Sequence, residues 1–316
     1  MIYLEMAGRL GNQLFRYAFA RKIQELTGEE LYIDFKRVYE KGQKENGWTN
    51  SLKMFKTKPY KEVVNKKKEI FYKNSTIMQK TVYFLYKMGN QILKKNKNNL
   101  IKYQLKMQPL LNRYNLYFLE LGYYNYNFKY LDKQKVKYIC GCFECENYFL
   151  DIKDNILKEF EPIKPKEEKN IALYEKIEKT NSICMSIRRG DFISNEKNRK
   201  MYDICNLQYY SKSIDIMKKK LKNPVLFVFS DDIKWAKENI KFKGIDIFFE
   251  DGNDTVDEKL RLMYSCKHFI ISNSTFSWWA QFLSRNPDKI VISPNKWYKN
   301  GLDSDLINKN WIKIEV

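Results

Sequence analysis

The stretch that decides the fold runs from residue 224 to residue 240 and reads PVLFVFSDDIKWAKENI. Its first part, from Pro224 to Phe229, is an apolar run that predicts a β-strand. Ser230-Asp231-Asp232 follows where a helix N-cap belongs, and residues 233–240 continue as that helix. A strand that passes directly into a helix is typical of a parallel α/β sheet.

The same alternation extends outward from this stretch in both directions. In the C-terminal half, strands are expected at 183–187, 244–249, 268–271 and 289–292, and helices at 207–221, 256–263 and 277–283. In the N-terminal half, strands are expected at 1–5 and 138–143, with a helix after the first of them. Such alternation predicts a parallel sheet with helices on both faces, and ligands outside the carboxyl ends of its strands.

The length of 316 residues suits two domains. We predict an N-terminal domain over residues 1–160 and a C-terminal domain over residues 161–316, with the best linker at 162–168. Residues 50–120 are rich in lysine and are expected to form a mostly helical insertion in the first domain.

The formal charge of +20 is concentrated in the middle of the chain. From Lys53 to Lys106 there are fifteen lysines against Glu62 and Glu69, a net of +13. Two interpretations stay open: biased composition on solvated faces, and peripheral contact with an anionic membrane, where each lysine contributes ~1 kcal/mol. Nucleic acid is not expected as a partner, because no helix-turn-helix, RNP or zinc pattern is present.

Neither a targeting segment nor a membrane span is recognisable in the sequence. We therefore expect a cytoplasmic protein, with peripheral association at the inner face of the plasma membrane as an extension. The six cysteines and the single histidine, His268, lack the spacing of a zinc site, so no metal site is expected. The cysteines are expected to be reduced, and His268 to be packed within the sheet.

The first candidate binding segment is Gly8-Arg9-Leu10-Gly11-Asn12-Gln13, directly after the first strand. Glycines allow a sharp turn and the close approach of a ligand. The amides of Asn12 and Gln13 could orient sugar hydroxyls. A purely structural strand-to-helix turn is the alternative, and the spacing differs from the dinucleotide fingerprint.

The second candidate is Arg188-Arg189-Gly190-Asp191, at the carboxyl end of the 183–187 strand. Arginine is the side chain suited to bidentate contact with phosphate. Because adjacent residues of a strand point to opposite faces, one arginine can reach a ligand while the other pairs elsewhere. The alternative is a surface ion pair.

Two further segments each allow two interpretations. Asn273-Ser274-Thr275-Phe276-Ser277 lies between a strand and a helix, so it is either a phosphate cradle of backbone N–H groups or a simple N-cap. Trp278 and Trp279, which follow, are expected in the core. Ser230-Asp231-Asp232 is either a helix cap or a source of a carboxylate for ribose or base.

Taken in order, these segments resemble the α-1,2-fucosyltransferases of glycosyltransferase family 11. The matching segments are GRLGNQLFRYA at 8–18, GCFECENYF at 141–149, SIRRGD at 186–191, FSDD at 229–232, LMYSCKHFIISNSTFSWW at 262–279 and ISPNKWY at 292–298. Nearly the whole chain is covered apart from the lysine-rich middle. Each segment is weak alone, and the ordered set is specific.

The resemblance implies a GT-B fold, in which two Rossmann-like domains face each other across a cleft. It implies transfer of L-fucose from GDP-fucose, with inversion, to the 2-OH of a galactose in a glycan, without a metal or a cofactor. Arg188 is carried over as the arginine on the donor diphosphate. Ser274, Thr275 and Phe276 are carried over as its cradle.

The remaining assignments concern the sugar, the nucleoside and the acceptor proton. Asn12, with Gly11 beside it, is carried over to the donor sugar and acceptor. Ser230 and Asp231 are candidates for the nucleoside. Asp191 and Glu5 are candidates, by location only, for the base that accepts the acceptor proton.

The chain departs from the family pattern at two positions. The family histidine before the arginines is Ser186 here, which excludes imidazole chemistry at that point. Lys259 stands where bacterial relatives carry aspartate, so Asp257 or Glu258 is left to read guanine; we assign Glu258. A different linkage or acceptor is the main alternative function, ahead of a basic nucleic-acid-binding or membrane-binding protein.

Overall fold

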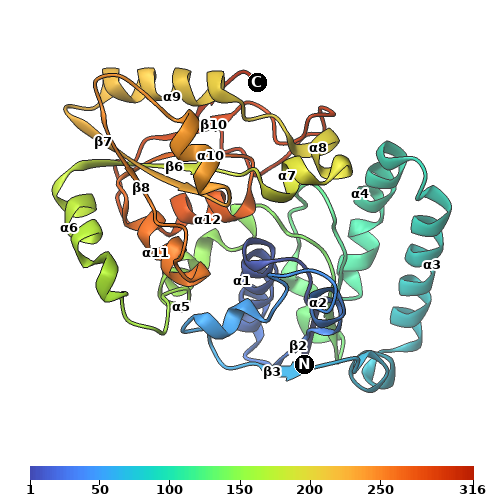
Figure 1. Ribbon diagram of the computed structural model, residues 1–316. Helices are drawn as coiled ribbons and strands as arrows, with labels where there is room; N and C mark the ends of the chain where they lie inside the picture. Colours follow the sequence, from blue (N-terminus) through green and yellow to red (C-terminus); the bar gives the residue numbers. More distant parts are fainter. The chain divides into compact units, whose positions relative to one another are not determined.

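The computed structural model describes the backbone of residues 1–316 and every side chain except that of Lys97. The chain divides into two compact units, Met1–Lys53 with Thr57–Glu159 and Met54–Lys56 with Phe160–Val316. Each unit is built around one parallel sheet with helices packed on it (Figure 1). The predicted α/β class with two parallel sheets is confirmed.

The N-terminal unit has five strands in the spatial order β3-β2-β1-β5-β4. Their bounds are β1 Ile2–Glu5, β2 Leu31–Asp34, β3 Lys61–Val63, β4 Leu116–Tyr117 and β5 Lys137–Ile139. From β1 the chain moves outward to β2 and β3, and it later fills the other side with β4 and β5. The strand order therefore reverses between β1 and β5, the place where sheets of this kind bind ligands.

Five α-helices belong to the N-terminal unit: α1 Leu10–Thr27, α2 Lys36–Gly42, α3 Ile77–Leu93, α4 Lys97–Arg113 and α5 Lys153–Glu159. Helices α3 and α4 lie side by side (Figure 1). They can approach closely because Gly89 has no side chain: a Cβ there would lie 2.2 Å from the Tyr103 ring. The Tyr103 hydroxyl donates to the Leu85 carbonyl at 3.1 Å. The helical character predicted for residues 50–120 is confirmed for this pair.

The C-terminal unit has six parallel strands in the order β11-β10-β9-β6-β7-β8. Their bounds are β6 Asn181–Ile187, β7 Pro224–Ser230, β8 Asp246–Phe249, β9 His268–Ile270, β10 Val291–Pro294 and β11 Ile312–Ile314. The strand order reverses between β6 and β9. The strands predicted in this half are confirmed within a few residues, and β11 was not predicted.

Seven α-helices belong to the C-terminal unit: α6 Ile171–Lys179, α7 Gly190–Ser194, α8 Glu196–Tyr202, α9 Leu207–Lys220, α10 Ile233–Asn239, α11 Val256–Ser265 and α12 Thr275–Leu283. Helices α9 and α11 lie on opposite sides of the sheet (Figure 1). Trp278 and Trp279 are buried, as predicted, and the Trp278 indole donates to the Leu306 carbonyl at 3.0 Å. His268 is packed in the sheet, where its Nδ1 accepts the Ile290 N–H at 3.1 Å.

A short segment from the N-terminal half belongs to the second unit. Phe55 forms an antiparallel bridge with Pro162, and its buried ring lies 6.0 Å from the Phe160 ring. Phe160 in turn packs edge-on against Trp279 at 5.2 Å. No sequence signal marked this exchange. Among the described residues, no helix combines the length and the apolar character that crossing a bilayer requires.

Gln13 has a structural role, in place of the sugar-orienting role considered for its amide. It is fully buried, and its Nε2 donates to the carbonyls of Gly8 at 2.9 Å and Thr49 at 2.8 Å. Its Oε1 accepts the Ser51 N–H at 3.0 Å. One amide therefore satisfies three backbone groups and joins the glycine turn to residues 49–51.

We expect Gln13→Leu to destabilise the protein by roughly 2–4 kcal/mol, because it leaves buried backbone groups without partners. The measurement is urea unfolding followed by circular dichroism. Gln208→Leu, at an exposed position of α9, is the matched control and should change the unfolding midpoint little. Equal midpoints for the two variants would show that the bridge made by Gln13 contributes nothing.

Candidate active site

The candidate donor site lies where the strand order of the C-terminal sheet reverses. Strand β6 ends at Ile187 and is followed directly by Arg188. Its neighbour β9 ends at Ile270 and leads to the start of α12 at Thr275. Because β6 and β9 are parallel and adjacent, both segments leave the sheet at the same edge.

Arg188 is held between two carboxylates. Its Nη1 lies 2.8 Å from Asp231 Oδ2, and its Nη2 forms an ion pair and hydrogen bond with Asp191 Oδ1. The guanidinium also lies over the Phe192 ring, 5.4 Å from the centroid. The Arg188 side chain is 25% exposed, so the group is fixed in direction and still accessible to a ligand.

The glycine after the two arginines is needed for this arrangement. A Cβ at Gly190 would lie 2.4 Å from Asp231 Oδ2, the oxygen that pairs with Arg188. Asp231 is held from the other side by the Arg189 N–H, which donates to Oδ1 at 2.8 Å. Asp231 is therefore a positioning residue for Arg188 in this structure.

Two roles were predicted for Ser230-Asp231-Asp232, a helix cap and a contact to the nucleoside, and the structure shows the cap at one of these residues. Asp232 is the cap of α10, since Oδ1 accepts the Trp235 N–H at 3.2 Å. Ser230 Oγ accepts the Asp232 N–H at 2.9 Å. Arg189 points away from Arg188, with Nε at 3.3 Å from Asp232 Oδ2 and its guanidinium 3.8 Å from the Trp235 ring centroid. Nucleoside contacts by Ser230 and Asp231 stay predictions.

The start of α12 presents backbone N–H groups at the same edge. Ser274, at the N-cap position, makes no side-chain cap hydrogen bond, and Ser274, Thr275 and Phe276 are half-buried. The first N–H groups of any helix have no partner within the helix, and the helix dipole favours an anion there. The Ser274 N–H already donates to the Ser272 carbonyl at 2.8 Å, so a diphosphate cradle here would use the N–H groups that follow it in α12, and the cradle stays a prediction.

Hydroxyl groups fix α12 to the sheet. Ser277 Oγ lies 2.6 Å from Ser186 Oγ and 3.0 Å from Ser272 Oγ, and all three residues are buried. Asn273 Nδ2 donates to the carbonyls of Tyr202 and Trp297, each at 2.9 Å. Ser186, which replaces the family histidine, thus ties strand β6 to the helix that follows β9.

Glu258 lies in a buried network on α11. Its Oε1 accepts from the Glu167 N–H at 3.1 Å and from Asn170 Nδ2 at 3.2 Å, and its Oε2 lies 3.1 Å from Arg261 Nη1. Both oxygens are therefore engaged within the protein. A contact between Glu258 and guanine stays a prediction, and it would require this network to open.

Lys259 has a partner that the sequence did not reveal. Its Nζ lies 2.9 Å from Oε1 of buried Glu250, and the same oxygen accepts the Ser230 N–H at 2.8 Å. Burial raises the pKa of Glu250 above its ordinary value, against the opposing effect of Lys259. The lysine that departs from the family pattern thus supports the strand end that carries Ser230.

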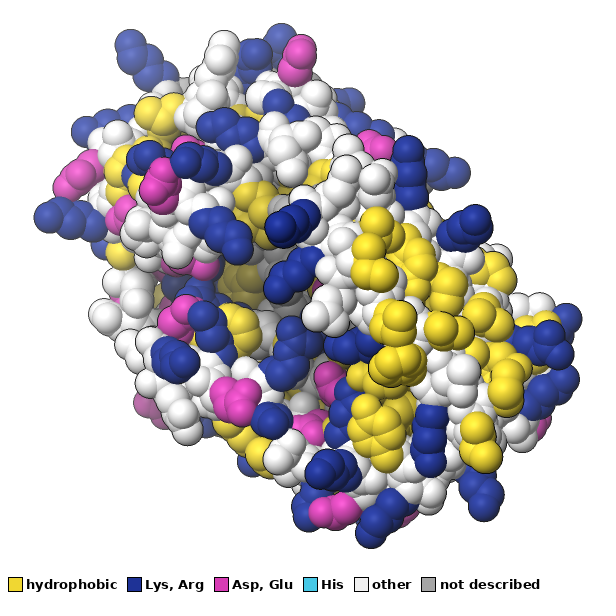
Figure 2. Space-filling model, turned by 90° about the vertical axis from the view of Figure 1, so that its right-hand side faces the viewer, with side chains coloured by type: hydrophobic (Ala, Val, Ile, Leu, Met, Phe, Trp, Pro, Cys, Tyr) yellow, Lys and Arg dark blue, Asp and Glu magenta, His cyan; other side chains and the backbone are white. Residues whose placement is uncertain are grey.

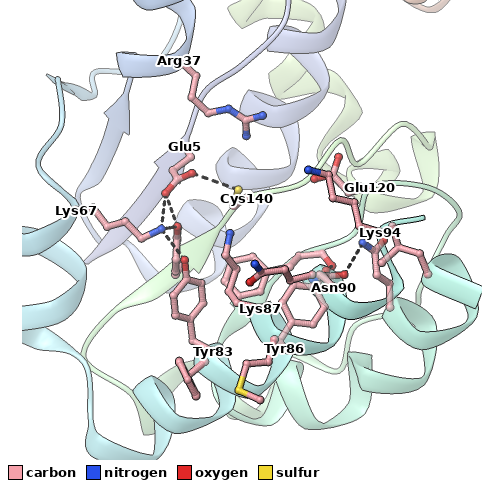
Figure 3. Close-up of a pocket in the computed structure, with 17 residues that line it drawn as sticks. Glu5, Arg37, Lys67, Tyr83, Tyr86, Lys87, Asn90, Lys94, Glu120 and Cys140 are labelled. Carbon is pink, nitrogen blue, oxygen red and sulfur yellow. Dashed lines mark hydrogen bonds and ion pairs between the residues drawn. The ribbon is translucent and has the colours of Figure 1, made fainter. Parts of the chain in front are cut away.

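The N-terminal unit contains a pocket of about 800 Å³ at the corresponding edge of its own sheet (Figure 3). Glu5 ends β1 and Cys140 follows β5, so the pocket lies where that strand order reverses. Helix α3 forms the opposite wall with Tyr83, Tyr86 and Lys87, among others. Aromatic rings and hydrogen-bonding side chains around a concave space are the features that bind small polar ligands.

Glu5 is the centre of a hydrogen-bonded cluster at this pocket (Figure 3). Its Oε1 accepts from Lys67 Nζ at 2.9 Å and from the Tyr138 hydroxyl, and its Oε2 accepts from Cys140 Sγ at 3.4 Å. Burial acts to raise the pKa of Glu5, but Lys67 and these hydrogen bonds outweigh it and the pKa is lowered. Glu5 is therefore ionised, held in place and only weakly basic.

Asn12 and Gly11 lie in the first turn of α1, after the turn at Gly8. Gly8 has φ of +88°, and a Cβ there would lie 2.5 Å from Asn12 Cβ. The turn therefore requires glycine at this position. Asn12 is half-buried and is not among the residues that line the pocket.

Glu144 is a carboxyl that the sequence did not mark. Burial raises its pKa to about 7, with Arg16 lowering it and Glu120 raising it further. It follows β5, as Cys140 does, and lies within the segment at 141–149 that carries the family resemblance. Only the three-dimensional surroundings give Glu144 a pKa near neutrality.

We expect Glu144→Gln to stabilise the protein at pH 8 and to have little effect at pH 5. A raised pKa means that folding favours the protonated carboxyl, so its stabilising contribution is lost as pH rises from 4.5 through about 7. The gain at pH 8 should be on the order of 1–3 kcal/mol. Thermal unfolding at both pH values measures it, with Glu238→Gln, exposed on α10, as the control. A gain of equal size at pH 5 contradicts this account.

Among the described residues, no group of three or more histidine, cysteine, aspartate or glutamate side chains could hold a metal ion. In the C-terminal unit, Arg188 and the start of α12 form an edge that suits an anion. In the N-terminal unit, the pocket combines charged and amide side chains with apolar and aromatic ones.

Comparisons with known proteins identify the family of this chain. The chain is 37% identical over 188 residues to an alpha-1,2-colitosyltransferase of Escherichia coli, which covers 58% of this chain and 64% of that protein. It is 35% identical over 150 residues to the O-antigen biosynthesis glycosyltransferase WbnK of Escherichia coli, covering 46% of this chain and 49% of that one. The chain thus spans about half to two thirds of the length of these relatives.

More distant similarities were also found. A galactoside alpha-(1,2)-fucosyltransferase 1 of Rattus norvegicus is 29% identical over 104 residues, 32% of this chain and 28% of that protein. Among solved structures, the NodZ alpha-1,6-fucosyltransferase soaked with GDP-fucose has 15% identity and a TM-score of 0.47, covering 92% of this chain and 94% of that one. The family model described as "Glycosyl transferase family 11" matches residues 1–315, so the chain belongs to glycosyltransferase family 11.

Proposed function

We propose that this protein is an inverting glycosyltransferase that moves L-fucose from GDP-fucose to the 2-OH of a galactose in a glycan acceptor. The observation that carries the proposal is Arg188, fixed at a strand end beside the start of α12. Membership in family 11 and the similarity to named fucosyltransferases support the sugar and the donor.

The donor chemistry requires a site for growing negative charge. As the bond from C1 of fucose to the diphosphate breaks, charge builds up on the β-phosphate oxygens. Arg188 and the N–H groups at the start of α12 can take up this charge once the diphosphate is bound. Preorganised donors of this kind contribute roughly 3–4 kcal/mol each in other enzymes.

Diphosphate binding must redistribute the contacts of Arg188. Asp231 is restrained by the Arg189 N–H and by its close approach to Gly190, so it keeps one edge of the guanidinium in place. Asp191 lies on the short helix α7 and is 34% exposed. We therefore assign to Asp191 the contact that gives way to phosphate.

The acceptor is assigned to the pocket of the N-terminal unit. The rings of Tyr83 and Tyr86 are packed in the core beneath the pocket, and Lys87, Asn90 and Glu120 line it with polar groups that suit sugar hydroxyls. Glu5 and Asp191 are both ion-paired, and the pKa of Glu5 is lowered. A weak base of this kind suits a loose transition state, in which the acceptor proton leaves late.

A colitosyl donor is the second candidate, favoured by the 37% identical relative. Colitose is L-fucose without its 3-hydroxyl, so both sugars present the same anomeric carbon to the same diphosphate site. Discrimination then depends on contacts to the 3-hydroxyl, because a site that hydrogen-bonds a hydroxyl rejects the analogue that lacks it.

A donor screen tests the proposed reaction directly. GDP-fucose, GDP-colitose, GDP-mannose and UDP-galactose are offered with simple β-galactosides, with EDTA present, and products are identified by NMR. We expect α-1,2-linked fucose from GDP-fucose at a rate unchanged by EDTA, since charge is taken up by Arg188 and backbone groups. Loss of turnover with EDTA, restored by a divalent ion, would overturn the proposed charge stabilisation.

We expect Arg188→Ala to lower kcat by roughly 10²–10³-fold, because the guanidinium faces the departing GDP. Arg188→Lys should recover only part of the loss, since an ammonium lacks the bidentate fork. Arg189→Ala removes the same charge from the neighbouring position on Trp235 and is the matched control. Steady-state kinetics at saturating donor measures all three; equal losses at both arginines would contradict the assignment.

A further inference from the structure

Helix α3 carries apolar side chains on two opposite faces. Val82, Tyr83 and Tyr86 are buried in the core of the N-terminal unit. The opposite face is exposed over the whole length of the helix and consists of Ile77, Met78, Phe84, Leu85, Met88 and Ile92. We call this set the α3 outer face.

The α3 outer face is too apolar for an ordinary solvated helix. Ile77 is 81% exposed, Ile92 75% and Phe84 61%. Spacings of three, four, seven and eight residues place these side chains on one side of the helix, over about 22 Å. Figure 2, which views this side of the protein, shows hydrophobic side chains gathered into a continuous area. Patches of this kind mark interaction surfaces.

The charge around the α3 outer face has one sign. Lys80, Lys87 and Lys94 recur every seven residues, so they line one edge of it. From Ile70 to Leu119 the chain has eight lysines, one arginine and no acidic residue. A partner must therefore be both apolar and negatively charged over an area the length of α3.

We propose that the α3 outer face docks α3 flat on the surface of an anionic phospholipid bilayer. Its isoleucine, leucine and phenylalanine side chains enter the boundary between headgroups and acyl chains, and the lysine row binds the lipid phosphates. Long lysine side chains suit this position because their stems are apolar and their ends reach the charged layer. Apolar area and electrostatic attraction together set the strength of such binding.

Docking would also position the pocket. Phe84 and Met88 of the α3 outer face and Lys87 and Lys94 of the lysine row also line the pocket, so the two surfaces adjoin along α3. If the proposed function holds, the acceptor site then opens beside the lipid, where a lipid-linked glycan would be presented. The docking proposal itself rests only on α3 and is tested separately from transfer.

The test is flotation of the purified full chain with vesicles. We expect binding to vesicles of phosphatidylglycerol and phosphatidylcholine, at least tenfold weaker binding to phosphatidylcholine alone, and weakening by 0.5 M salt. The triple variant Ile77→Ser, Leu85→Ser, Ile92→Ser changes exposed residues outside the pocket lining. It should lose at least tenfold in vesicle binding, with unchanged circular dichroism and unchanged transfer to a soluble acceptor.

The matched control is Leu150→Ser, Ile163→Ser, Ile171→Ser, which removes three exposed apolar side chains elsewhere. It should bind vesicles as the original chain does. Equal binding by the two triple variants overturns the proposal. Light scattering that shows a dimer for the original chain and a monomer for the α3 variant also overturns it, since the face would then join two copies. Tight binding to generic RNA, together with no binding to vesicles, would likewise overturn the proposal that α3 docks on a bilayer.

Discussion

The clamp on Arg188 is the interaction on which the rest of the donor site depends. The side chain of an arginine at a strand end can adopt many orientations. Here two carboxylates and the Phe192 ring restrict the Arg188 guanidinium to one orientation. The clamp needs Gly190, since any side chain there would displace Asp231. It also needs the serine contacts that hold α12 against β6, because the arginine is useful only beside the helix start.

The architecture could be predicted from the sequence where strands are long and apolar. Residues 183–187 and 224–229 stand out because a strand covered on both faces is apolar throughout. Strands β2, β3, β4 and β11 were not predicted, since whether such short segments pair depends on neighbours far along the chain. The placement of Phe55 in the second unit is hidden for the same reason.

The location of the candidate site was predictable from the sequence, but most of the side-chain contacts that hold it in place were not. Arg188 was recognisable because a charged residue followed a strand, and Asp191 lies three residues away. Asp231 is 43 residues from Arg188, and only the pairing of β6 with β7 brings them together. Glu144 and the Glu250–Lys259 pair depend on burial. The charge of α3 was evident from its lysines, whereas its second apolar face required knowing which face is buried.

The placement of Met54–Lys56 has a consequence for dividing the chain into fragments. Since this tripeptide belongs to the second unit and its flanking residues to the first, the chain passes between the units three times, at 53/54, 56/57 and 159/160. Cutting the chain at residue 160 would separate Phe55 from its contacts with Phe160 and Pro162, so neither fragment would keep its complete core.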